Sequence, residues 1–238
     1  MNILKPRKIL VDNLITIENL LDEIKATEKL ENINLENYKE SNIEINDITI
    51  EKSIIHNTDI IDSNLPKNTF VDIEFNNCNF SNTKFENCTF IRCLFNNCKM
   101  TGDSFIDSLL NNVSFTESNL NYANFAMANM ENILLDNTIL RNSNFQENKL
   151  KNIVLKNADL TQAQFFKSSL NDIDFSDSII EGIIVSIEDL KGAIINEFQA
   201  VDLIGLIGAV SYTHLDVYKR QFSNCSMCCM YLPIQISN

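Results

Sequence analysis

An unbroken five-residue period constrains this chain more than any other feature of its sequence. Every fifth residue from Ile45 to Ile180 is apolar, and all 28 of these positions are Ile, Leu, Phe or Met. An α-helix repeats near 3.6 residues and a strand repeats every two, so neither element explains the period. The pattern indicates a repeat architecture in which each unit of five residues contributes one apolar side chain to a common core.

Two further positions of the unit are restricted. Two residues before the central apolar residue, from 73 to 178, sixteen of 22 side chains are Ala, Ser, Thr, Cys or Val. Two residues after it, from 72 to 177, fifteen of 22 are Asn, Asp or Gly. These three residue types best tolerate left-handed and turn conformations. Each unit is therefore predicted to contain an inward small residue and a tight corner.

The units SFTES, NLNYA, NFAMA and NMENI over 114–133, and ADLTQ over 158–162, resemble the A(D/N)LXX pattern of pentapeptide-repeat proteins. Members of that family form a square coil in which four five-residue sides make one turn. The resemblance implies an all-β fold, a right-handed quadrilateral β-helix with short capping helices at its ends.

Side-chain size also repeats every twenty residues. Four of the six exceptions to the small-residue rule are isoleucines that share one phase of a twenty-residue count: Ile73, Ile133, Ile153 and Ile173. Another phase contains five phenylalanines: Phe85, Phe105, Phe125, Phe145 and Phe165. We expect these phenylalanines to form one buried ladder. At about 4.8 Å per turn, roughly seven turns give a rod on the order of 34 Å long.

Both ends of such a rod expose apolar side chains and unpaired backbone, so both need a cover. Residues 9–24 have apolar side chains at 4-3-4-3 spacing, which predicts an amphipathic helix within an N-terminal capping segment, 1–44. The repeat coil is assigned to 45–192, and a C-terminal capping and dimerisation helix to 193–209.

The C-terminal helix has a sequence signature for its start. Asn196 is a plausible N-cap, with Gln199 three residues later. The run EGIIVSIEDLKGAIINEFQAVDLIGLIG resembles the end of Gram-positive pentapeptide-repeat proteins related to the quinolone-resistance (Qnr-like) group, in which a terminal helix joins two subunits into an elongated dimer. The resemblance implies a homodimer interface formed by Phe198, Val201, Leu203, Ile204 and Ile207.

The last segment, 210–238, is set apart as a non-native tail. Its residues 210–221, VSYTHLDVYKRQ, resemble the translation of two sequencing-library adapters joined head to head. A short cluster that resembles a metal site, Cys225, Cys228 and Cys229, falls in this tail and is therefore given no role. We expect 210–238 not to pack as part of the repeat core.

No pattern indicates catalysis, so we expect a protein that is not an enzyme and that has no cofactor and no metal. Four cysteines occupy the inward small position on three faces, which favours buried structural thiols over a zinc site. They are Cys78, Cys88, Cys93 and Cys98. Asp103 and Asn148 occupy the same inward position, and hydrogen bonds with nearby backbone amides explain them better than a functional buried acid does.

The net charge of −13 argues against direct nucleic-acid or membrane binding through a basic patch. No apolar run approaches the roughly 20 residues that span a bilayer. The N-terminus has acidic residues within its apolar pattern and does not resemble a signal peptide. We therefore expect a cytoplasmic protein with reduced cysteines.

The resemblance implies a protein partner, because acidic rods of the quinolone-resistance group mimic B-form DNA and bind DNA gyrase and topoisomerase IV. Charge moderates this expectation, since residues 66–180 contain 13 acidic and nine basic side chains. B-DNA of the same length, roughly 28 Å, would carry about 16 negative charges. A generic interaction scaffold with an unrelated partner is the alternative.

One face concentrates negative charge when outward residues are sorted by the twenty-residue count. It contains Glu74, Glu117, Asp136, Asp174 and Asp177, against Lys156. We predict that this face binds a basic partner, while a chance asymmetry among few charges stays open. The array from 45 to 180 has no insertion, whereas several quinolone-resistance proteins use projecting loops for their effect. The lack of loops is compatible with topoisomerase binding but argues against protection from the drug.

Overall fold

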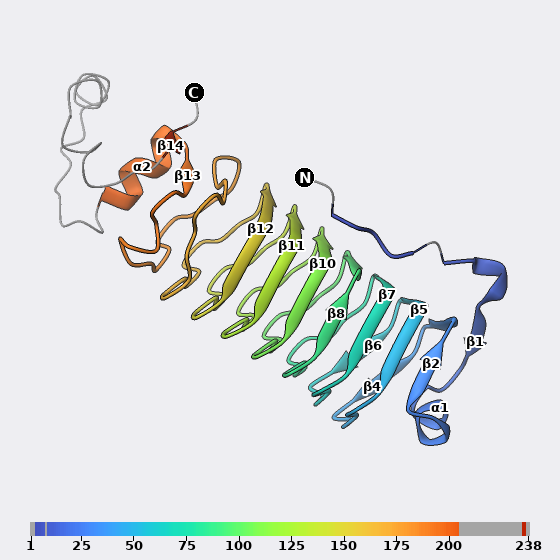
Figure 1. The fold of residues 1–238 in the computed structure, drawn as a ribbon. Helices are drawn as coiled ribbons and strands as arrows, with labels where there is room; N and C mark the ends of the chain where they lie inside the picture. Colours follow the sequence, from blue (N-terminus) through green and yellow to red (C-terminus); the bar gives the residue numbers. More distant parts are fainter. Residues whose placement is uncertain (1–2, 8, 205–234, 237–238) are drawn as a thin grey trace.

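The computed structural model describes residues 3–7, 9–204 and 235–236. Over these residues the chain forms a parallel β-helix of about seven turns, seen from its side as a rod in Figure 1. The strands are β1 (Ile15–Ile17), β2 (Lys29–Glu31), β3 (Ile33–Glu36), β4 (Lys39–Ser41), β5 (Thr49–His56), β6 (Asp59–Ile61), β7 (Thr69–Asn76), β8 (Thr89–Ile91), β9 (Leu94–Asn96), β10 (Leu109–Thr116), β11 (Asn129–Asp136), β12 (Lys149–Lys156), β13 (Ile194–Ile195) and β14 (Gln235–Ile236). The helices are a 3-10 turn (Val11–Asn13), α1 (Leu20–Ala26) and α2 (Glu197–Ile204).

The twenty-residue turn is confirmed by the strand register. β5 pairs with β7 so that Ile50 lies beside Phe70, and β10 pairs with β11 so that Leu110 lies beside Met130. All of these pairs are parallel and offset by twenty residues. The eight-residue strands β5, β7, β10, β11 and β12 each cover two faces, whereas isolated bridges and turns form most of the other two.

The predicted corners are also confirmed. From 32 to 172, the residue two after the central position of each five-residue unit has a positive φ, and 28 of these residues are not glycine. Asn and Asp fill most of the positions because their short polar side chains tolerate the left-handed region. Gly102 occupies one of them with a φ of +78°, and a Cβ there would lie 2.6 Å from the Asn82 side chain.

Aromatic side chains stack along the core. The expected ladder is present, with ring centroids 5.4, 4.9, 5.0 and 4.9 Å apart from Phe85 to Phe165. A second ladder joins Phe75, Phe95 and Phe115 at 4.5 and 4.9 Å. Near-parallel rings at the spacing of the turns fill the narrow interior without leaving room for solvent.

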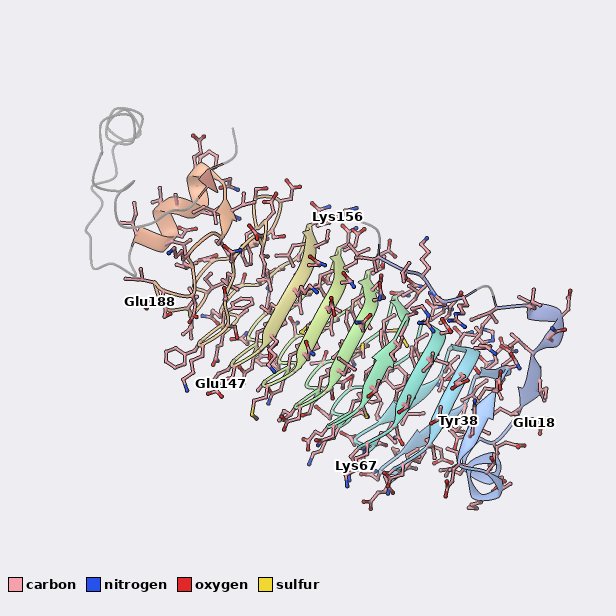
Figure 2. All side chains as sticks on the ribbon, in the orientation of Figure 1. Glu18, Tyr38, Lys67, Glu147, Lys156 and Glu188 are labelled. Carbon is pink, nitrogen blue, oxygen red and sulfur yellow. The ribbon has the colours of Figure 1, made fainter. Side chains whose placement is uncertain are left out.

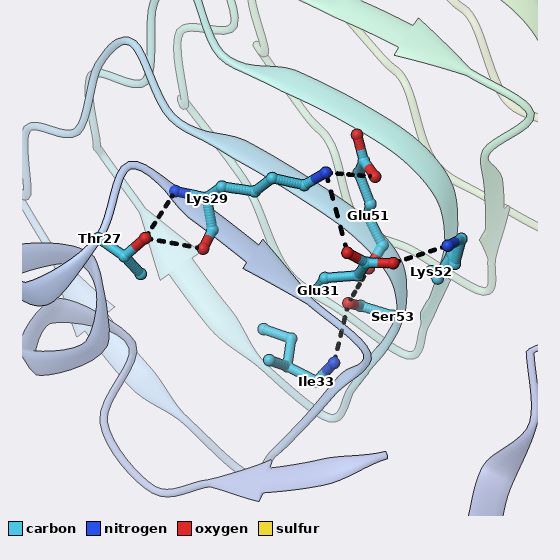
Figure 3. Close-up of polar contacts among 7 residues, drawn as sticks. All are labelled: Thr27, Lys29, Glu31, Ile33, Glu51, Lys52 and Ser53. Carbon is cyan, nitrogen blue, oxygen red and sulfur yellow. Dashed lines mark hydrogen bonds and ion pairs between the residues drawn. The ribbon is translucent and has the colours of Figure 1, made fainter. Parts of the chain in front are cut away.

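The inward small residues do more than save space. The Ser53 hydroxyl accepts a hydrogen bond from the Ile33 N–H at 3.0 Å and donates one to the Glu51 carbonyl at 2.6 Å (Figure 3). Asn68 likewise accepts from the Ile48 N–H one turn earlier. At these positions the N–H of one turn is satisfied by the side chain of the next, which a buried amide requires.

The N-terminal cap differs from its prediction. Residues 9–24 do not form one amphipathic helix, because β1 occupies their middle and pairs with β3, placing Ile15 beside Ile33. The β-branched run of β1 favours a strand. α1 begins only after Asn19, whose side chain accepts a hydrogen bond from the Leu21 N–H. Parallel pairing thus begins before the expected start of the coil at 45.

The C-terminal cap agrees closely with its sequence signature. The Asn196 side chain accepts hydrogen bonds from Phe198 N–H and Gln199 N–H, and Gln199 Oε1 accepts one from Asn196 N–H at 2.9 Å. This reciprocal pair is a capping box at the start of α2. Gln199 Nε2 also donates to the Phe175 and Ser178 carbonyls at 2.7 Å, which fixes the helix to the end of the coil.

Two residues of the tail touch the coil. β14 pairs in parallel with β13, placing Gln235 beside Ile194. This bridge lies at the end of the coil, so the expectation that 210–238 does not pack as part of the repeat core stays a prediction. Residues 210–234 and 237–238 lie outside the described part of the chain.

A seam interrupts the coil after β12. Within the described residues, no parallel bridge and no backbone hydrogen bond joins β12 to residues 169–176. Pairing resumes at Ile179, whose N–H donates to the Ala158 carbonyl at 2.9 Å. At the seam, Leu150 and Ile153 are half-buried, and a small apolar cavity of about 20 Å³ lies between them and Ile173.

Candidate functional site

The five acidic residues predicted for one face lie on that face but do not form a single cluster. Glu74 lies in β7, and Asp174 lies five twenty-residue repeats later in the same phase, beyond the seam after β12. Glu117 and Asp136 are neighbours, because the Glu117 N–H donates to the Asp136 carbonyl at 2.9 Å. Asp177 lies beyond the seam and is exposed.

These five carboxylates have no ion-pair partner among the described residues. Some acids elsewhere on the coil are paired, since Lys151 bonds Glu131 at 2.6 Å and Lys167 bonds Glu147 at 2.8 Å. Others, such as Asp62 and Asp107, have no ion-pair partner among the described residues either. In Figure 2, Glu147 and Lys156 project from opposite edges of the coil. Exposed ion pairs add little stability, but they cancel charge locally. The acidic face therefore keeps its negative charge.

An apolar stripe runs along the centre of the same face. Its members are outward, half-buried side chains in the column of Glu74: Ile54, Leu94, Leu134 and Val154. Ser114 completes the column and is buried. The face thus combines unpaired carboxylates with apolar surface, which duplex DNA does not present. Sequence analysis missed the stripe, although its twenty-residue spacing is visible in the sequence.

The predicted dimer residues fall into different environments. Phe198 is 76% exposed, and Val201 and Ile204 are half-buried. Leu203 is buried against the core of its own chain. Ile207 lies outside the described residues. The surface of α2 that the structure leaves apolar and exposed is therefore centred on Phe198.

The four coil cysteines are buried and free, as predicted. Burial raises the pKa of Cys88 and of Cys93 to about 12. The neighbouring Cys78 thiol and burial together raise the pKa of Cys98. The same contact with Cys98 lowers the pKa of Cys78, although burial opposes this. Cys88, Cys93 and Cys98 therefore stay protonated, and a protonated thiol is a poor nucleophile and a poor metal ligand. The described residues contain no group of three or more side chains positioned to hold a metal ion.

Asp103 is fully buried in the core. Its Oδ1 accepts a hydrogen bond from the Thr83 N–H, as expected, but its Oδ2 has no partner among the described residues. Burial raises the pKa of this carboxyl well above its usual value, although the Thr83 N–H acts in the opposite direction. Asn148 repeats the arrangement, since its Oδ1 accepts from the Ala128 N–H at 3.1 Å. Both residues therefore belong to the hydrogen-bonding framework of the coil.

Two cavities in the described coil are small and apolar. The one at the seam measures about 20 Å³, and another of about 30 Å³ lies near Leu20 and Ile45 at the N-terminal end. Each is close to the volume of one water molecule and is too small for a substrate. None of the described helices is long and apolar enough to cross a membrane.

Sequence analysis also missed a polar corner. Asp72 and Arg92 form a two-pronged ion pair, with Arg92 Nε and Nη2 at 2.6 and 2.8 Å from the carboxylate. Burial alone would raise the pKa of Asp72, but hydrogen bonds from Arg92 and from the Arg7 backbone N–H lower it. Asp72 is only 2% exposed because residues 3–7 lie over it.

Comparison with known families agrees with this architecture. A model of the pentapeptide repeat region matches residues 68–145, and a model of eight pentapeptide repeats matches residues 138–177. The fold and the matched repeats together define the class: residues 68–177 consist of pentapeptide repeats, and they form a pentapeptide-repeat β-helix. No curated protein sequence matches it significantly.

Two solved structures illustrate the similarity. HetL, a pentapeptide-repeat protein involved in regulating heterocyst differentiation in the cyanobacterium Nostoc sp. strain PCC 7120, is 16% identical, with a TM-score of 0.42 over 76% of this chain and 97% of HetL. A trypsin-treated form of QnrB1, a plasmid-mediated fluoroquinolone resistance protein, is 18% identical, with a TM-score of 0.39 over 77% of this chain and 99% of QnrB1.

Proposed function

We propose that this chain is a non-catalytic protein-binding rod whose acidic face contacts a basic groove of its partner. The supporting observation is the set of five carboxylates without ion-pair partners: Glu74, Glu117, Asp136, Asp174 and Asp177. Unpaired surface charge of one sign steers an oppositely charged partner and raises the association rate. Such binding weakens as salt is added, because the Debye length shortens.

The first partner that we propose is a type II topoisomerase, either DNA gyrase or topoisomerase IV, which the chain would bind in the cytoplasm. It follows from the sequence resemblance to the quinolone-resistance group, whose acidic rods occupy the DNA-binding groove. The rod would then act as a DNA mimic and modulate the enzyme, with a quinolone-resistance-like role. The carboxylates on one face supply the negative charge that such mimicry requires.

A scaffold that binds an unrelated protein is the second candidate. The apolar stripe of Ile54, Leu94, Leu134 and Val154 favours it, since DNA offers no equivalent surface. Protein interfaces combine an apolar centre with a polar rim. A partner that uses the stripe would bind through apolar burial and would tolerate salt better than a DNA-binding groove does.

Homodimer formation through α2 is part of the same proposal. Phe198 is a large aromatic side chain, 76% exposed at the end of the rod, and such residues often anchor interfaces. Val201 and Ile204 are half-buried beside it on the helix. Sedimentation of the parent as a dimer and of Phe198→Glu as a monomer is the expected result. A monomeric parent would remove the dimer from the proposal.

The charge of the face can be tested without changing its shape. In one triple variant, Glu117→Gln, Asp136→Asn and Asp174→Asn remove three charges. A matched control removes three charges from other faces: Asp62→Asn, Glu86→Gln and Asp107→Asn. Inhibition of gyrase supercoiling is measured for the parent and both variants. We expect the parent and the control to inhibit and the acidic-face variant to lose inhibition.

Other results discriminate between the two candidates. Equal inhibition by the parent and both variants would show that the charged face is not used. If none of the three inhibits gyrase or topoisomerase IV, the topoisomerase proposal fails. Recovery of an unrelated bacterial protein by the parent, with loss after Leu134→Ser, would then support the scaffold.

A further inference from the structure

The N-terminal strap, defined as residues 3–7, lies across one corner of the coil. The Leu4 N–H donates to Asn112 Oδ1 at 3.0 Å, and the Arg7 N–H donates to Asp72 Oδ1 at 2.8 Å. Figure 1 shows the N-terminal segment running alongside the coil, away from the strands that follow it in sequence. Of the 28 non-glycine residues with positive φ, only Asp72 and Asn112 are buried.

The spacing of the strap matches the spacing of the coil. Asp72 and Asn112 are forty residues, or two turns, apart, which is about 9.6 Å at the usual strand separation. The donors at 4 and 7 are three residues apart, and an extended or polyproline-like chain spans about 9–10 Å in three residues. The two backbone donors, three residues apart along the strap, therefore match the two side-chain acceptors, two turns apart along the coil.

The burial of the segment has the same period. Ile3, Pro6 and Ile9 are half-buried, whereas Leu4, Lys5 and Arg7 are exposed. Pro6 has no N–H, and at its position the register requires none. A three-residue period with proline on the contacting side is typical of polyproline recognition. The corner thus recognises an extended chain through a repeating pattern of one backbone bond and one apolar contact.

The corner continues beyond the strap. The next acceptor in register, two turns beyond Asn112, is Asn152, which is exposed. Its Nδ2 donates to Asn132 Oδ1 at 2.9 Å, and its own Oδ1 accepts no hydrogen bond from a described residue. Asn152 thus lies in register with the two acceptors that residues 4 and 7 occupy, two turns beyond the contacts of the described strap.

We propose that this corner is a docking groove for an extended, basic, proline-containing peptide of a partner protein, and that the strap is a built-in competitor for it. The strap shows the chemistry that fits, with apolar residues or proline every third position and exposed cations between them. Two backbone hydrogen bonds to the coil make it readily displaced. The net charge of −13 on the chain attracts a basic ligand at long range, although Asp72 at the corner is itself paired with Arg92. This groove runs along one edge of the acidic face, since Asp72 is two residues before Glu74 in β7. The proposal uses other residues than those of the face and does not depend on the proposed function.

The test uses the full chain and proline substitutions. Leu4→Pro with Arg7→Pro removes both donors and leaves the coil unchanged. Lys5→Pro is the matched control, because the Lys5 N–H makes no hydrogen bond to a described residue. The probe is a fluorescein-labelled peptide of sequence ILKPRKIL, residues 3–10, followed by fluorescence anisotropy. A scrambled peptide of the same composition controls for charge.

We expect the double-proline variant to bind the probe at least about tenfold more tightly than the parent or Lys5→Pro, because a tethered strap competes at millimolar effective concentration. Adding Asn112→Ala to the double variant should weaken binding about fivefold, the usual effect of one hydrogen bond. Absence of binding to the double variant, or equal affinity for all three chains, would overturn the proposal. Exchange of the strap between two copies, seen as a dimer that the double variant loses, would also overturn it.

Discussion

Thr83 and Asp103 are joined across one turn of the coil, with the Thr83 N–H donating to Asp103 Oδ1 at 3.1 Å in the fully buried core. Asn68 makes the same acceptor contact one face away, and its Nδ2 also donates to the Ile45 and Leu65 carbonyls. An ionised Asp103 has no such donor. The coil therefore accommodates this residue best as a neutral carboxylic acid.

Stability should consequently depend on the protonation of Asp103. Its pKa is raised by burial, so the folded state binds the proton more tightly than the unfolded state. The stabilisation is fully present below the unfolded pKa, near 4, and is lost as pH rises toward the folded pKa. Asp103→Asn should remove this loss and raise the free energy of unfolding at pH 7 by about 1–3 kcal/mol.

Urea unfolding from pH 4.5 to 8 measures this effect, and the difference between variant and parent should grow with pH. Asp107→Asn, at an exposed corner, is the control and should leave the pH dependence of the parent unchanged. Parallel pH profiles for Asp103→Asn and the parent would show that Asp103 does not titrate in this way.

The phenylalanine ladder should dominate the stability of the coil. Phe125 is fully buried, and its ring lies 4.9 Å from Phe105 and 5.0 Å from Phe145. Phe125→Ala should lower the free energy of unfolding by about 3–5 kcal/mol, because the rigid stack cannot close the cavity. Phe166→Ala, at an exposed position, should change it by less than about 1 kcal/mol. If chemical denaturation showed similar losses of unfolding free energy for the two variants, the ladder would not be the main source of stability.

The coil thiols should be structural and unreactive. Cys78→Ala or Cys98→Ala should preserve the fold and cost far less than loss of a phenylalanine ring, since a thiol occupies a small volume. Truncation after residue 209 removes Cys225, Cys228 and Cys229, so that a thiol reagent can react only with the coil cysteines. At pH 8 the reagent should label the folded, truncated chain only as fast as the protein unfolds. Rapid labelling, or zinc retained through purification and detected by mass spectrometry, would contradict this assignment.

Removing the tail should not weaken the fold. Gln235 and Ile236 are the residues of 210–238 that the structure describes, and they contact the coil through one two-residue bridge to β13. A chain ending at residue 209 should melt within about 2 °C of the parent, because so short a pairing contributes little. A fall of many degrees would mean that the tail belongs to the folded protein.

The central coil could be predicted because its sequence repeats without interruption. Sorting the sequence by its twenty-residue period identifies the column of inward isoleucines that includes Ile73. The same sorting identifies the phenylalanine ladder that includes Phe125. The hydrogen-bonding role of the inward residues could not be inferred from side-chain size alone. It is reflected in the choice of Ser53, Asn68 and Ser108 where Ala would also fit.

The ends and the lateral contacts could not be predicted in the same way. Residues 9–24 satisfied a helical apolar spacing, yet Ile15–Ile17 gains more by pairing with β3, a tertiary effect that local pattern does not contain. The contact of Leu4 with Asn112 joins residues 108 positions apart. Phase sorting placed the five acids on one face, but it could not show which of them have ion-pair partners.

The seam after β12 has a mechanical consequence. In a rod of stacked turns, axial tension passes from one turn to the next through backbone hydrogen bonds. Between β12 and residues 169–176, two of the four sides lack these bonds within the described chain. A pulled or bent rod should therefore yield there first. The turns after β12, together with α2, should then tilt relative to the preceding coil while that coil stays folded.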